Sequence, residues 1–354
     1  MNFTREHLNT IPIHFILCTE RTGSSLLSLI LNLHPKILSP SEEPFALYFY
    51  KSYKNKTVWT DKELHQFIDV FWLMAEKNLA LFFTSKEKLF IALEPYKTDL
   101  PYNILIKIIY LQFYEPKPKQ EISIIVDKQI KYFFYLKQLL PIFPNSKFIV
   151  LVRDPKVNAQ RKKLRNLNSG SSPIYLSALW KNTYNNIYYL KKYSKQITVV
   201  KYEDFVSNPT SIVESLCGFL NVPFTQQMLK TDGVYESFLE IQKNKINEAH
   251  LSHLKDFHSG LFTKINTEKI GLNENEIDET INNKIIKITK PLLKEFGYKI
   301  SSKTNQLNIN DYFQIMKARL YRPLLIQFYL HIPLSIKLII KRLKKYLFPN
   351  STIY

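Results

Sequence analysis

Short apolar runs alternate with longer helical segments along most of the chain. The runs have the length of buried parallel strands rather than of helices. We predict strands over Ile13–Cys18, Ile122–Val126, Lys147–Val152 and Ile197–Val200. We predict helices between them over Leu26–Leu33, Ile104–Phe113, Lys137–Phe143, Ile174–Tyr193 and Ser211–Leu220. This alternation predicts an α/β fold of three layers, in which helices flank a central parallel sheet.

A charged or polar residue follows each predicted strand. Arg21 lies in the turn after the first strand and Lys128 follows the second. Arg153 follows the third strand and Tyr202 the fourth. Because sheets of this kind place ligands at the carboxyl ends of their strands, we expect these four side chains to converge at one edge.

The turn TERTGSS, residues 19–25, holds one arginine, one glycine and four hydroxyl side chains. We expect Ser24 or Ser25 to cap the helix that follows, whose positive end suits an anion. Arg21 adds a fork of donors suited to phosphate or sulfate oxygens. An ordinary turn with a surface arginine explains this stretch equally well when it is taken alone. The patterns G-x-x-x-x-G-K-[ST] and G-x-G-x-x-G are both absent, which argues against the corresponding ATP, GTP and redox dinucleotide sites.

The composition is that of a basic globular protein. The chain of 354 residues is 45% hydrophobic, enough for one large core or for a core with an appendage. A net charge of +19 suggests a polyanionic partner, although an A/T-rich genome would also enrich lysine. Cys18 and Cys217 form no disulfide framework or zinc pattern, so we expect a reducing, cytoplasmic setting. We identify no signal peptide, and no apolar run reaches the ~20 residues of a spanning helix.

The segment 301–354 differs in composition from the chain before it. We predict a polar linker over residues 301–310, after which Phe313–Phe348 carries eight Lys or Arg residues and no acidic residue. Pro323 and Pro333 are expected to break this segment. We expect a basic amphipathic helix pair that lies on an anionic membrane and makes the protein peripheral on its inner face. A helical hairpin packed back on the domain is the alternative.

Four sequence segments, in register, resemble the PAPS-dependent sulfotransferase family, in particular its bacterial, carbohydrate and tyrosyl-protein branches. CTERTGSSLL is similar to the loop for the 5′-phosphosulfate, and FPNSKFIVLVRDP to the strand and turn for the 3′-phosphate. VVKYEDFVSNPTSIVESLCGFLNVPF is similar to the Y-E-D-L segment of the family. KINTEKIG, followed by KPLLKEFGY, is similar to its lid and closing helix. The resemblance covers about residues 11–300. It implies a P-loop-like fold and a sulfotransferase domain over 1–300, followed by the tail over 301–354.

The resemblance implies the residues that bind the nucleotide. The 5′-phosphate and sulfuryl oxygens would be held by Arg21, Thr22, Gly23, Ser24 and Ser25. Lys128 would steady the bridging oxygen as it leaves, Arg153 would bind the 3′-phosphate and Tyr202 would lie near the adenine. Lys269 and Gly271 belong to the lid segment. Where the family motif has a serine, eight residues after its arginine, this chain has Arg161, which could bind the phosphate by charge.

The resemblance also implies PAPS as co-substrate, no metal, and a glutamate base shortly after the first helix. Glu42 and Glu43 occupy that place, and we favour Glu43 as the base that accepts the proton of the acceptor hydroxyl. A glycan, lipid or small-molecule acceptor fits the apolar segment 48–83, which we expect to be helical and mostly core. His250, His253 and His258 are expected to serve the lid or acceptor site.

Two other function classes stay open at this point. A non-catalytic protein that binds a membrane or nucleic acid with a degenerate sulfotransferase fold is the main alternative, and Arg161 favours it. A small-molecule kinase is third, and the missing P-loop lysine argues against it. Among these we favour the enzyme, without nucleic acid as a partner.

Overall fold

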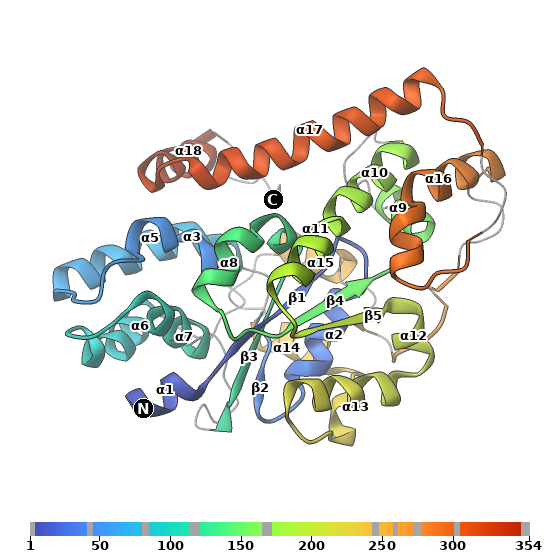
Figure 1. The fold of residues 1–354 in the computed structure, drawn as a ribbon. Coiled ribbons are helices and arrows are strands. Elements are labelled where there is room, and N and C mark those ends of the chain that lie inside the picture. The colour runs from blue at the N-terminus through green and yellow to red at the C-terminus, as the bar shows by residue number, and fades with distance from the viewer. Residues whose placement is uncertain are drawn as a thin grey trace.

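The computed structural model describes residues 4–40, 45–79, 85–112, 121–164, 172–242, 248–257, 261–262, 264–268, 270–271, 278–300 and 305–347. Their centre is a sheet of five parallel strands in the order β2-β3-β1-β4-β5 (Figure 1). The strands are β1 Ile13–Leu17, β2 Ile37–Leu38, β3 Ile124–Gln129, β4 Phe148–Val152 and β5 Ile197–Lys201. All four predicted strands are therefore confirmed, with shifts of up to three residues at their ends. The two-residue strand β2 was missed because so short a run carries no periodicity.

Helices cover both faces of the sheet, as the predicted α/β fold requires (Figure 1). The helices up to the fourth strand are α1 Arg5–Thr10, α2 Ser24–Asn32, α3 Phe45–Tyr48, α4 Tyr50–Tyr53, α5 Asp61–Leu79, α6 Lys86–Leu93, α7 Tyr102–Gln112 and α8 Leu136–Ile142. Those after it are α9 Pro155–Leu164, α10 Pro173–Tyr184, α11 Asn186–Tyr193, α12 Tyr202–Ser207, α13 Pro209–Leu220, α14 Val234–Gln242, α15 Glu248–Phe257, α16 Glu279–Glu295, α17 Ile309–His331 and α18 Leu334–Leu347. Short 3-10 turns are η1 Glu94–Tyr96, η3 Tyr132–Tyr135 and η4 Gln226–Leu229.

Alternate residues of each central strand enter different cores. Phe15 of β1 is fully buried in the larger core, which α5, α7, α10 and α11 help to form. Ile16, the next residue, is fully buried in the smaller core with residues of α2, α12 and α13. Because successive strand side chains point to opposite faces, both faces of the sheet are apolar and the strands read as continuous apolar runs.

Two predicted boundaries need correction. The single helix expected over Ile174–Tyr193 is divided into α10 and α11 at Asn185. The helix expected over Leu26–Leu33 is α2, which begins at Ser24, and its N-cap is Gly23, not Ser24 or Ser25. The aromatic residues of the 48–83 segment that the structure describes are mostly core, as predicted, since Phe49, Phe67 and Phe71 are fully buried.

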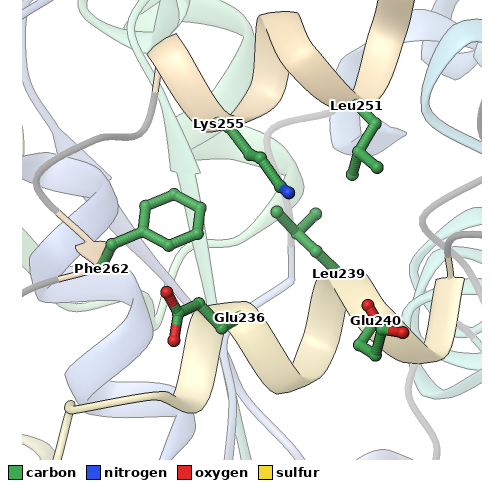
Figure 2. A pocket seen from close by; sticks show the side chains of 6 residues that line it. All are labelled: Glu236, Leu239, Glu240, Leu251, Lys255 and Phe262. Atoms are coloured by element: carbon green, nitrogen blue, oxygen red, sulfur yellow. The ribbon is translucent and has the colours of Figure 1, made fainter. Parts of the chain in front are cut away.

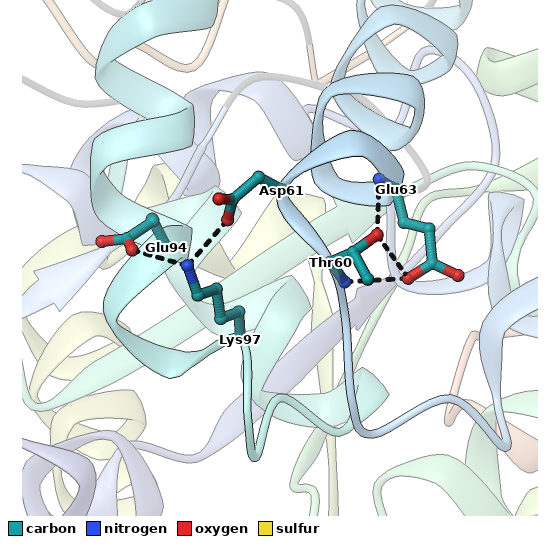
Figure 3. Close-up of polar contacts among 5 residues, drawn as sticks. All are labelled: Thr60, Asp61, Glu63, Glu94 and Lys97. Carbon is teal, nitrogen blue, oxygen red and sulfur yellow. Dashed lines mark hydrogen bonds and ion pairs between the residues drawn. The ribbon is translucent and has the colours of Figure 1, made fainter.

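Charged side chains fix the start of α5 beside the end of α6. Thr60 and Glu63 exchange hydrogen bonds at the first turn of α5, and Figure 3 shows these two residues close together. Lys97 forms ion pairs with both Asp61 (2.8 Å) and Glu94 (2.9 Å), so it links α5 to η1. A hydrogen bond from Lys56 and those from Thr60 lower the pKa of the Glu63 carboxyl to about 2.

The tail forms α17 and α18, which make an outer layer at the top of Figure 1. α17 continues through position 323, so the prediction that Pro323 breaks the segment is wrong, whereas Pro333 does separate the two helices. α17 packs along α10 and α18 along α5. The alternative arrangement, in which the tail packs back on the domain, is thus present on one side of the tail. Among the described residues, no helix is both long and apolar enough to cross a membrane.

The buried histidine of the central strand makes a testable contribution to stability. His14 is 3% exposed, and its Nδ1 accepts a hydrogen bond from the Lys147 N–H at 3.0 Å. Burial, followed by the charge of Lys147, lowers the pKa of the imidazole from 6.5 to about 4. The unfolded chain therefore binds more protons than the folded chain between these two values. The stabilisation by neutral His14 is complete above pH 6.5 and is lost as the pH falls toward 4.

We predict that His14→Asn removes this pH dependence, because the Asn carbonyl can accept the same hydrogen bond without titrating. The free energy of unfolding of the wild type minus that of the variant should fall by about 3 kcal/mol between pH 7 and pH 4. Urea titrations at a series of pH values measure this difference. A difference that stays constant over the range would contradict the neutral buried state of His14.

Candidate anion-binding site

The sharp turn between β1 and α2 is shaped around Gly23. Its backbone has φ of 83° and ψ of 14°, a left-handed conformation that suits glycine. A Cβ atom added at this position would lie 2.4 Å from Cδ2 of the Tyr202 ring. The glycine is thus required both by its backbone and by the ring packed against it. The turn aims the start of α2 at the carboxyl edge of the sheet, where its first N–H groups have no partners within the helix.

Residues of other elements hold the turn in place. The Thr22 hydroxyl donates a hydrogen bond to the Thr19 carbonyl at 2.8 Å. Asn158 of α9 donates to the Glu20 carbonyl at 2.8 Å, and Arg153 donates to the Arg21 carbonyl at 3.2 Å. Arg21 has a φ of 63°, rare for a residue with a side chain, so these bonds hold a strained backbone.

A buried ion pair joins the turn to α9. Nζ of Lys162 lies 3.0 Å from a carboxylate oxygen of Glu20, and the Lys162 side chain is 1% exposed. Asn158 and Lys162 are four residues apart, so they share one face of α9. Sequence reasoning singled out Arg161 of this helix but missed the support that Asn158 and Lys162 give to the turn. Proline at the first helical position and the i, i+4 spacing were the available signals.

The two charged residues near the end of β3 point to opposite faces of the sheet. Lys128 is paired with Ile16 in the strand register and is 4% exposed, and its Nζ lies 3.4 Å from the Ser25 hydroxyl of α2. Asp127 is fully buried on the other face, where it accepts hydrogen bonds from the hydroxyls of Tyr110 and Tyr132. Asp127 thus anchors the strand, and Lys128 faces the turn.

Arg153, which follows β4, stacks on Tyr202, which begins α12. The guanidinium carbon of Arg153 lies 4.1 Å from the centre of the Tyr202 ring, a cation–π geometry. Arg153 is 4% exposed, and its carbonyl accepts a hydrogen bond from the Trp180 indole at 3.1 Å. Glu203 accepts hydrogen bonds from the Asp154 N–H and the Tyr298 hydroxyl, both at 2.9 Å. These bonds fix the residues that follow Arg153 and Tyr202 in the chain.

The charges of three arginines act on the Tyr202 hydroxyl. Burial raises the pKa of the Tyr202 hydroxyl, and the charges of Arg153, Arg161 and Arg21 all act against that rise. Burial lowers the pKa of Arg153, and the nearby charge of Arg161 lowers it further. Nε of Arg161 is buried and has no hydrogen-bond partner among the described residues. Concentrated positive charge with an unpaired buried donor is the environment that an anion would stabilise.

The structure therefore brings together most of the residues that the sequence singled out at the sheet edge. Ser24 and Ser25 begin α2 beside Lys128, while Arg153 and Tyr202 lie against Gly23 and Arg21. Gly271 is described and exposed, and a Cβ there would meet open space. Glu42, Glu43 and Lys269 lie outside the described residues.

A separate cavity of about 510 Å³ lies between α14 and α15. Figure 2 shows Glu236, Leu239 and Glu240 from α14 across from Leu251 and Lys255 of α15, with Phe262 beside them. This lining contains none of the residues of the strand-edge site. Among the described residues no cluster of metal-ligating side chains is present. The side chains of His250, His253 and His258 are outside the described part of the structure.

Comparisons with known proteins identify the family. Residues 12–226 match the family model described as "Sulfotransferase family", and residues 174–297 match the one described as "Sulfotransferase domain". The chain belongs to the sulfotransferase family. The first of these matches alone spans more than half of this sulfotransferase, and together they include the turn, β4 and α12.

One solved structure agrees with this assignment at the level of the fold, and a second is reported for its sequence similarity alone. The sulfotransferase domain of the olefin synthase from Synechococcus PCC 7002 is 22% identical, with a TM-score of 0.51, and the match covers 82% of this chain and 96% of that domain. The sulfotransferase domain of the curacin biosynthetic pathway is 22% identical, with a TM-score of 0.44 and coverage of 82% and 99%. No curated protein matches the chain. The resemblance inferred from the sequence and the predicted P-loop-like α/β fold are therefore confirmed.

The contact between Gly23 and Tyr202 gives a testable prediction for this sulfotransferase. Gly23→Ala should destabilise the protein by about 1–3 kcal/mol, because alanine disfavours the left-handed backbone and its Cβ overlaps the Tyr202 ring. Gly218→Ala is the matched control, since its Cβ would meet no atom within 4 Å on α13. Urea unfolding should leave this control as stable as the wild type or slightly more so. Equal stability of the two variants would contradict the described packing.

Proposed function

We propose that the protein transfers a sulfuryl group from PAPS to a hydroxyl of a glycan, lipid or small-molecule acceptor. Membership of the sulfotransferase family gives the general activity. The observation that carries the proposal is that Arg153 stacks on the Tyr202 ring, which packs against Gly23 at the start of α2, while the charges of Arg21 and Arg161 also act on Tyr202. This arrangement offers cationic donors around one aromatic ring, a combination suited to a nucleotide with phosphates at both ends of its ribose.

The 5′ end of the nucleotide fits the turn. We assign its phosphate to the first N–H groups of α2, to the backbone N–H of Thr22 and to the hydroxyls of Ser24 and Ser25. Thr22 is fully buried and is held by the Thr19 carbonyl, which supports a backbone role for that residue. Arg21 would meet the sulfuryl oxygens, and these donors need no metal to hold the anion.

The 3′-phosphate fits Arg153 and Arg161. Arg153 is stacked on Tyr202, so its remaining donors have a fixed direction. We propose that Arg161 replaces the usual serine and binds the phosphate by charge, which agrees with its buried unpaired Nε. Tyr202 would then contact the adenosine between the two phosphates. We place Lys269 and Gly271 in the lid over the nucleotide.

The transfer step needs one group that stabilises the departing phosphate and one group that accepts the proton of the acceptor hydroxyl. PAPS supplies a sulfuryl sulfur whose bond to the bridging phosphate oxygen breaks as a bond to the acceptor oxygen forms. Lys128, 3.4 Å from Ser25, lies where its charge would stabilise the negative charge on the departing phosphate. Glu43, or else Glu42, would accept the proton of the acceptor hydroxyl as that hydroxyl attacks.

The described chain next to the two glutamates supports this role. The Ser39 hydroxyl donates to the Val126 carbonyl at 3.0 Å, and the Ser39 N–H donates to Asn32 at 3.0 Å. Val126 is two residues before Lys128 on β3, so the chain leaves Ser39 close to the proposed site. Four residues span at most about 14 Å, which limits how far Glu43 lies from this point.

A thermal-shift experiment tests the proposed nucleotide. PAP at about one hundred times its dissociation constant should stabilise the protein by ~2.7 kcal/mol, and the same concentration of ATP should give little or no shift. Arg161→Ser should reduce the shift with PAP yet leave that with adenosine 5′-phosphate unchanged, because only PAP carries the 3′-phosphate. Lys163→Ser, an adjacent exposed residue of α9, controls for the loss of one charge.

Two outcomes would contradict these assignments. If ATP stabilises the protein as much as PAP, the site does not recognise the 3′-phosphate, and the PAPS proposal is wrong. If Arg161→Ser weakens PAP and adenosine 5′-phosphate equally, or restores tighter PAP binding as the family serine would, Arg161 does not bind the 3′-phosphate by charge.

The base assignment makes a separate prediction about turnover. Glu43→Gln should lower transfer of label from radioactive PAPS into acceptors of a cell lysate by about a hundredfold or more, because general base catalysis is lost. Its thermal shift with PAP should stay at the wild-type value. Glu42→Gln is the matched control and should keep most activity. An active Glu43→Gln together with an inactive Glu42→Gln would move the assignment to Glu42.

A binding protein without turnover is the second candidate, and the departure at Arg161 favours it. Such a protein would bind PAP in the thermal-shift experiment but transfer no label from PAPS. The same two measurements therefore separate the two functions.

A further inference from the structure

We propose that the outer face of α17 and α18 is a docking surface for an anionic lipid bilayer. This surface is separate from the nucleotide site and does not depend on the transfer reaction. It would make the protein peripheral on a membrane, held by the tail.

Large apolar side chains form one stripe along each tail helix. On α17 the exposed ones are Ile309, Tyr312, Phe313, Met316, Leu320, Leu324, Leu325 and Phe328. On α18 they are Ile336, Ile339, Ile340, Leu343, Tyr346 and Leu347. Steps of three and four residues connect the members of each set, so each set shares one side of its helix. We call these two sets together the tail stripe.

The opposite side of each helix is already used by the domain. On α17, Ala318 and Ile326 are buried in the domain cores, and Asp311 forms an ion pair with Lys284 of α16 at 2.8 Å. On α18, Lys337 is 7% exposed, and Lys341 donates a hydrogen bond to the Met74 carbonyl of α5. The tail stripe is therefore the face left over after the helices have packed on the domain.

The concentration of apolar surface sets this face apart. Nineteen large apolar side chains are exposed among the described residues, and fourteen of them belong to the tail stripe. Scattered exposed apolar residues are ordinary, whereas a continuous apolar surface on a soluble domain marks an interaction site. At 1.5 Å per residue α17 alone is roughly 35 Å long, so the stripe is too extended for a small ligand.

The charge around the stripe favours an anionic surface as the occupant. Residues 305–347 contain eight Lys or Arg residues, of which Lys337 and Lys341 face the domain, and a single acid, Asp311, which is already paired with Lys284. Lys317 and Arg319 are exposed on α17 beside the stripe. A second copy of the chain would bring the same positive charge against it, and like charges repel. An anionic bilayer instead matches both the apolar stripe and the basic flanks.

Docking through this face would hold the catalytic edge near the lipid. α17 packs along α10, and the Trp180 indole of α10 donates a hydrogen bond to the Arg153 carbonyl. A single helix layer therefore connects the tail to the proposed 3′-phosphate site. Removing the tail would also uncover α10, so point substitutions on the stripe test the proposal better than a truncation does.

Vesicle flotation with the full chain tests the proposal. The wild type should float with vesicles of equimolar phosphatidylglycerol and phosphatidylcholine, and bind phosphatidylcholine vesicles about tenfold or more weakly. Leu324→Gln with Phe328→Gln should reduce binding to the anionic vesicles by a similar factor, because two exposed stripe side chains are lost. Lys317→Gln with Arg319→Gln should weaken anionic binding and reduce its dependence on salt.

Val58→Gln with Ile91→Gln is the matched control, since it replaces two apolar residues of the domain that are 60% and 63% exposed. It should bind vesicles like the wild type, and all variants should keep the wild-type melting temperature. Equal binding to both vesicle types, or wild-type binding by the stripe variant, would overturn the proposal. So would a wild-type dimer that binds no vesicles and becomes monomeric in the stripe variant.

Discussion

The contact between the Tyr202 ring and the backbone of Gly23 is the constraint on which the site depends. It leaves no room for a side chain at residue 23 and so fixes where α2 begins. The same ring carries Arg153 at 4.1 Å, so the position of the turn also sets the position of the arginine. One aromatic residue, at the start of α12, thus couples the ends of β1, β4 and β5.

The positive charge gathered around this contact is costly without an anion. Arg153 and Lys128 are almost fully buried, and Arg161 adds its charge nearby. Burial of cations is tolerated in proteins when partners or ligands compensate for it. One acid near the turn, Glu20, is already paired with buried Lys162, and Glu203, which accepts bonds from Asp154 and Tyr298, offsets part of the charge of Arg153. The arrangement therefore favours a ligand that brings its own negative charge.

Local sequence patterns were enough to predict the sheet and the edge at which its charged and polar residues gather. The four strands follow from the length of the apolar runs, which is a short-range property. The residues at their ends gather at one edge because the strands are parallel. Features that depend on distant contacts were missed or misplaced. Gly23 replaces the serines as N-cap because of Tyr202, which is far away in sequence. The support by Asn158 and Lys162 appears only once α9 is packed against the turn.

The error at Pro323 has the same origin. Proline disrupts an isolated helix by removing a donor and crowding the preceding turn. α17 nevertheless continues through position 323, and its packing against α10 stabilises the helix as a whole. Tertiary packing thus decides the helix boundaries that local propensity alone does not.

A crystal structure with PAP bound tests the account most directly. The account predicts the 5′-phosphate at the start of α2, on Gly23 to Ser25, and the 3′-phosphate between Arg153 and Arg161 with the adenosine against Tyr202. PAP bound in the cavity between α14 and α15 instead, or a strand-edge site that stays empty at saturating PAP, would contradict it.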